Sequence, residues 1–103
     1  MPKIFQYLNY VIRFYSNDHL PIHVHVQFRE EQECKVDFLF EGNELTLLFR
    51  KVKGKRPLTM SQAREVSVFL KTYKNAIIEK WQQVFIHHKE VRCEVIRKKL
   101  SRK

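Results

Sequence analysis

The sequence is poor in the features that mark several common classes of protein. Its two cysteines, Cys34 and Cys93, match no metal-binding or redox spacing. No apolar stretch approaches the roughly 20 residues that a membrane-spanning helix needs, and the first residues lack the charged start, apolar stretch and cleavage site of a signal peptide. We therefore expect a cytoplasmic protein with no membrane partner, in which both cysteines are ordinary semi-buried thiols without a role.

The length and composition fit one small globular domain. The chain has 103 residues, of which 44% are hydrophobic, and this is enough for a modest core. We predict a single α+β domain over residues 1–103, in which a small antiparallel sheet of three to five strands packs against one long helix or a helix pair.

Positive charge is concentrated in the second half of the chain. Residues 1–49 hold four basic and seven acidic side chains, whereas residues 50–103 hold sixteen basic and four acidic ones. Half of the basic side chains lie in two short runs: Arg50, Lys51, Lys53, Lys55 and Arg56, and then Arg97, Lys98, Lys99, Arg102 and Lys103. Such runs either are solvated and flexible or attract RNA, DNA or an acidic protein. We name Arg50 to Arg56 and Arg97 to Lys99 as candidate nucleic-acid-binding residues.

The first half of the chain has the alternation of strands. One strand is predicted to end at about residue 15, and a second begins at Ile22, with apolar and polar side chains on opposite faces. After a polar turn over 30–33, a third strand follows from Cys34, and Gly42-Asn43 predicts a hairpin into a fourth strand over 44–49.

The second half is predicted to be helical. Thr59 and Gln62 form the pattern of a capping box, so we expect a helix to begin there. An apolar stripe continues through Trp81 to Phe85. One helix of this length would overhang so small a domain, so we expect either that helix or two helices that meet near Lys74. The alternation of apolar and polar side chains after His88 favours a short final strand before the second basic run.

Chemistry is suggested by a run of three histidines around Pro21. His23 and His25 lie two apart on a predicted strand, so their rings leave the same face about 7 Å apart at the backbone, and His19 could fold back across Pro21 to join them. Three imidazoles at one point could hold a zinc ion with an open position, helped by Asp18 or Asp37. No HExxH spacing supports this metal site. We expect no cofactor, with a divalent metal at His19, His23 and His25 as the alternative.

The same histidines could act without a metal. A histidine can serve as general acid or base in RNA cleavage while a cation neutralises the phosphate. His23 or His25 would then act beside Arg13, Arg29 or Lys35, and Tyr15 could stack a base. A purely structural role is also open, in which His19 and His23 bond backbone carbonyls of the turn and His25 faces a partner.

The order of residues around the histidines resembles a known family. The run Phe14-Tyr15-Ser16-Asn17-Asp18-His19-x-Pro21-x-His23-Val24-His25-Val26, followed by strands, a Thr-capped helix and Trp81 to Phe85, resembles the bacterial domain-of-unknown-function family 4160 over about residues 2–86. The sequence departs from many relatives in having Ile22 where a second proline is common, and in its basic extension over about 87–103.

The resemblance implies a function that the residues alone do not. Members of that family are small proteins often encoded beside another small protein, and have been described as toxin–antitoxin components. We therefore expect a component of such a module, which could be the toxin, acting through a small protein partner encoded nearby, through RNA, or through both. The alternatives are a histidine-dependent ribonuclease or metal-dependent hydrolase, and a nucleic-acid-binding regulator. Catalysis would rest on His19, His23 and His25, supported by Tyr15, Ser16, Asp18, Arg13 and Lys35. The sequence predicts no oligomeric state.

Overall fold

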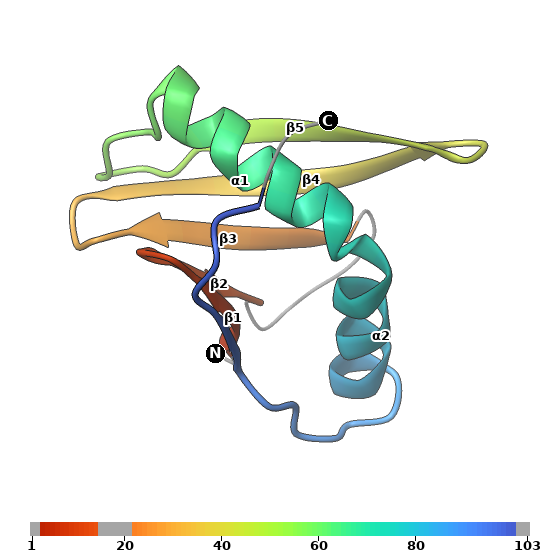
Figure 1. Ribbon diagram of the computed structural model, residues 1–103. Helices are drawn as coiled ribbons and strands as arrows, with labels where there is room; N and C mark the ends of the chain where they lie inside the picture. Colours follow the sequence, from red (N-terminus) through yellow and green to blue (C-terminus); the bar gives the residue numbers. More distant parts are fainter. Residues whose placement is uncertain (1–2, 15–21, 101–103) are drawn as a thin grey trace.

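The computed structural model describes residues 3–14 and 22–100 and contains one mixed sheet and two helices (Figure 1). The elements are β1 (Lys3–Tyr7), β2 (Tyr10–Arg13), β3 (His23–Phe28), β4 (Gln32–Glu41), β5 (Glu44–Lys51), α1 (Met60–Thr72), α2 (Lys74–Phe85) and β6 (Glu94–Ile96). The α+β class is therefore confirmed. The strands lie in the order β5-β4-β3-β2-β1-β6, so the chain builds the sheet outward from one edge and closes the other edge with its last strand.

The sheet is larger than predicted and is not purely antiparallel. It has six strands instead of three to five, and β6 runs parallel to β1, with Phe5 opposite Glu94. The parallel pair joins segments that are almost ninety positions apart, so no local turn signal announces it. The prediction of a purely antiparallel sheet is wrong for this reason.

The additional N-terminal strand comes from a hairpin whose two-residue turn is Leu8-Asn9. β1 and β2 pair with Tyr7 opposite Tyr10, and the tight turn between them contains Leu8 at φ 54°. This left-handed backbone is uncommon for leucine. The turn therefore carries none of the glycine or proline signals by which a hairpin is normally predicted.

From the β4–β5 hairpin to the end of α2, the structure matches the predicted elements. Gly42 has φ 62° in the hairpin between β4 and β5, a conformation that glycine adopts without strain. The Thr59 side chain accepts a hydrogen bond from the Gln62 backbone N–H, and the Gln62 side chain accepts one from the Thr59 N–H. The predicted capping box and the helix pair are both confirmed, with Tyr73 between the two helices.

Both helices pack on one face of the sheet. Phe69 of α1 is fully buried against Phe5 and Tyr7 of β1, and Phe85 of α2 contacts Phe14, which follows β2. The next strands add Val24, Val26, Val36 and Phe38 to this apolar core. The alternate side chains of each strand therefore point to the opposite face of the sheet.

Two further predictions are that both cysteines are ordinary thiols and that no helix crosses a membrane. Cys34 is buried and accepts a hydrogen bond from the Leu58 N–H, and Cys93 is half-buried; both are free thiols. Neither described helix is long and apolar enough to span a bilayer.

Candidate functional site

The candidate site is the sheet face opposite the helices, which we call the polar face. The strand registers bring onto it the side chains of Arg13, His23, His25, Gln27, Glu33, Lys35, Asp37 and Arg50. Four strands contribute to it, so residues 37 positions apart in the sequence become neighbours.

A line of nitrogen-bearing side chains crosses this face from β2 to β5. Arg13 lies opposite His25, His25 opposite Lys35, and Lys35 opposite Arg50. We call these four residues the basic row. Directly opposite residues in neighbouring antiparallel strands have their Cβ atoms about 5 Å apart, so the row follows a direct path across the sheet.

His25 and Glu33 form a buried pair beside the row. His25 Nδ1 lies 3.0 Å from Glu33 Oε2, and the two residues are only 5% and 7% exposed. Burial lowers the pKa of His25 below its ordinary value, although the Glu33 carboxylate opposes that shift. The ring is therefore held neutral near pH 7. Because a carboxylate only accepts, Nδ1 carries the proton and Nε2 is the acceptor nitrogen.

The second buried acid of the face neutralises one end of the basic row. Arg50 Nε lies 2.9 Å from Asp37 Oδ2, and Arg50 Nη2 donates to Asp37 Oδ1 at 3.0 Å. A two-point pair of this kind fixes both side chains. Among the described residues, the cations of the row that pair with no acid are therefore Arg13 and Lys35.

Arg13 has an incomplete set of hydrogen bonds. Its Nη2 donates to Gln27 Oε1 at 3.3 Å. Its Nε is buried and has no hydrogen-bond partner among the described residues. A buried donor without an acceptor is costly.

The predicted histidine site is described only in part. His23 and His25 lie on the same face, as predicted, with ring centroids 6.3 Å apart. His19, Tyr15, Ser16 and Asp18 lie outside the described residues. Within the described segments, no three histidine, cysteine or acidic side chains gather as metal ligands. The three-histidine metal site and its Asp18 support therefore stay predictions.

The two predicted basic runs leave the sheet at opposite edges. The first, Arg50 to Arg56, ends β5 and enters the following loop, whereas Arg97 to Lys99 follow β6. Several members contact the protein itself: Arg56 pairs with Glu31, Lys99 with Glu65, and Lys55 donates to a backbone carbonyl. Lys51, Lys53, Arg97 and Lys98 have no such partner within residues 3–14 and 22–100.

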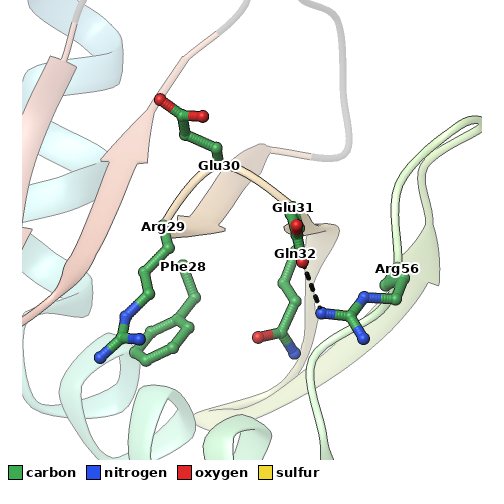
Figure 2. A pocket seen from close by; sticks show the side chains of 6 residues that line it. All are labelled: Phe28, Arg29, Glu30, Glu31, Gln32 and Arg56. Carbon is green, nitrogen blue, oxygen red and sulfur yellow. Dashed lines mark hydrogen bonds and ion pairs between the residues drawn. The ribbon is translucent and has the colours of Figure 1, made fainter.

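Arg29 does not belong to the polar face. It lies in the turn after β3 with φ 57°, and its guanidinium stacks 5.2 Å from the ring centroid of Phe28. This turn borders a pocket of about 400 Å³, shown in Figure 2. Six residues line the pocket: Phe28, Arg29, Glu30, Glu31, Gln32 and Arg56. The lining contains two arginines and two glutamates, so charge of one sign does not gather in the pocket. One of each forms an exposed ion pair, in which Arg56 Nη2 lies 2.8 Å from Glu31 Oε2.

Glu33 is the important side chain that the sequence analysis missed. We placed the turn over 30–33, whereas β4 already begins at Gln32, which puts Glu33 in the strand. The observed loop over 29–31 sets Phe28 opposite Gln32, and hence Gln27 opposite Glu33, which is diagonal to His25. The register of the β3–β4 hairpin is therefore the feature from which the position of Glu33 beside His25 could have been predicted.

Comparison with known proteins identifies one family. A model described as a domain of unknown function (DUF4160) matches residues 9–82, which is most of the chain. The match includes the whole basic row and leaves out β1 and β6. No curated protein and no solved structure matches the chain.

Proposed function

The chain belongs to the family of domains of unknown function DUF4160, and we propose that it is a component of a bacterial toxin–antitoxin-like module whose polar face engages RNA. The observation that carries the RNA part is the basic row, in which Arg13 and Lys35 flank His25 and pair with no acid among the described residues. A phosphate oxygen has the charge and the lone pairs that these two cations attract.

The electrostatics of the face support a phosphate chain over a single small anion. Arg13 and Lys35 lie on either side of His25, two strands apart, which is about 10 Å. This separation spans more than one phosphate of a nucleic-acid strand. Arg50, paired with Asp37, extends the row without adding full charge.

The module part of the proposal rests on the family and on charge. The chain carries a net charge of +9, so a small acidic protein encoded beside it is the natural antagonist. In this proposal the chain is the toxin, and the partner blocks the polar face.

Growth arrest after induced expression tests the proposal. The double variant Arg13→Gln/Lys35→Gln removes the two row cations that pair with no acid in the described part of the chain, and we expect it to abolish the arrest that the parent chain causes. The matched control is Arg64→Gln/Lys71→Gln, which removes the same charge from the exposed surface of α1. It should arrest growth like the parent. Equal arrest by both variants, or no arrest by the parent, contradicts the proposal.

A second candidate function, ribonuclease action, is favoured by the His25–Glu33 pair. Glu33 orients the imidazole of His25, and burial lowers the pKa of His25, so that the neutral ring is the form available as a base near pH 7. Arg13 or Lys35 would neutralise the phosphate. Incubation of labelled RNA with purified protein separates the candidates. Cleavage that is lost in His25→Asn, with RNA binding retained, supports catalysis, and intact RNA supports binding alone.

A further inference from the structure

The two edges of the sheet differ in how well they are protected. The edge at β6 is a strand of three residues, whereas the edge at β5 is a strand of eight. Short edge strands, prolines, bulges and charged side chains are the usual means by which proteins prevent pairing between sheets. β5 is long and has no proline or bulge, its charged residues lie only at its two ends, and Leu48 between them is 45% exposed. In Figure 1 the β4–β5 hairpin also reaches beyond both helices.

The side chains of β5 divide cleanly between its two faces. Leu45, Leu47 and Phe49 are half-buried on the helix side, and Glu44, Thr46, Leu48 and Arg50 lie on the polar side. A second copy could add its own β5 antiparallel to this edge about a two-fold axis normal to the sheet. The residue on that axis then lies opposite itself, and every other residue lies opposite one from the same face.

One register of the paired β5 strands places opposite charges against each other and also places apolar side chains against each other. Centring the axis on Leu47 sets Glu44 of each copy opposite Arg50 of the other, and Leu45 opposite Phe49. Centring it on Leu48 instead sets Thr46 opposite Arg50. The Arg50 side chain is 48% exposed in spite of its bond to Asp37, so it can receive a second carboxylate.

From this complementarity we infer that two copies of the chain pair through β5 in a symmetric dimer centred on Leu47. The contact joins the two sheets into one, with opposite charges at each end of the paired segment and apolar pairs between them. Because the axis is normal to the sheet, both polar faces lie on the same side. The dimer does not depend on the proposed RNA function.

Sedimentation equilibrium of the purified full chain tests the dimer. We expect twice the chain mass of 12.6 kDa. Glu44→Lys, which sets two like charges opposite each other, should weaken the dimer at least about tenfold. The matched control is Glu90→Lys, the same change at an exposed residue between α2 and β6, whose strand forms the opposite edge of the sheet. It should leave the dimer unchanged. A monomeric parent chain, or equal weakening by both variants, overturns the proposal.

Disulfide trapping tests the register. In a Cys93→Ser background, which leaves buried Cys34 as the other thiol, a Leu47→Cys substitution places two thiols opposite each other. Under mild oxidation it should give a covalent dimer, because directly opposite strand positions fall within disulfide reach. A Leu45→Cys substitution is the control, since its two copies would be about 13 Å apart. Equal trapping by both, or trapping by neither, overturns the register.

Discussion

The two faces of the sheet bury different kinds of side chain. The helix side buries apolar groups, among them Phe5, Tyr7 and Phe69, without exposing them to solvent. The polar face also buries three residues, but these are His25, Glu33 and Asp37. Apolar burial stabilises a fold directly, whereas buried charge must first offset the loss of its hydration.

This difference suggests separate roles for the two faces, with the helix side stabilising the fold and the polar face carrying the groups for the proposed function. The helix side contributes apolar burial that stabilises the fold, with Phe69 of α1 packed against β1. The pairs on the polar face contribute less to stability than apolar residues of the same size could. We infer that these charged and titratable groups are present for binding or chemistry.

The largest expected effect lies on the helix side. Phe69→Ala should lower the free energy of unfolding by about 3–5 kcal/mol, because Phe69 is fully buried and contacts the rings of Phe5, Tyr7 and Tyr73. Urea denaturation measures this. Trp81→Ala is the internal comparison, and its loss should be smaller because Trp81 is only half-buried beside the core. The reverse order would show that the core is centred on α2 instead of α1.

A smaller effect is expected on the polar face, and it depends on pH. The folded state holds the pKa of His25 below 6.5, mainly through burial, so the unfolded chain takes up a proton first as the pH falls. Stability should therefore be complete above about pH 6.5 and decrease below it. His25→Asn keeps a donor toward Glu33 and removes the titration, so its unfolding free energy should depend less on pH between 5 and 7. Identical pH profiles for parent and variant would contradict the burial of a neutral imidazole.

Local signals predicted the chain better from the β4–β5 hairpin onward than before it. The capping box at Thr59 and the Gly42-Asn43 turn each involve residues within three positions of one another, and both are found as predicted. The β1–β2 hairpin was missed because its turn uses Leu8 in a conformation typical of glycine. The edge strand β6 was predicted as a strand, but its pairing with β1 depends on contacts across the whole domain.

The sequence predicted which kinds of residue form the candidate site, but it predicted only part of their spatial arrangement. Alternation put His23 and His25 on one face, and the sheet registers add Arg13 and Lys35 as predicted neighbours. The pairing of His25 with Glu33 was not predicted, because a shift of one residue in a turn changes which strand positions face each other.

The most direct test of the division between the faces is the salt dependence of RNA binding. For the parent chain with a single-stranded RNA, we expect the logarithm of the association constant to fall linearly with the logarithm of salt concentration. Arg13→Gln/Lys35→Gln should reduce the magnitude of that slope by about 1.4, the value for two lost phosphate contacts on a single strand, at an unchanged melting temperature. Arg64→Gln/Lys71→Gln should leave the slope unchanged. An unchanged slope in the first variant, with a reduced slope in the second, would place RNA on the helix side and contradict the account.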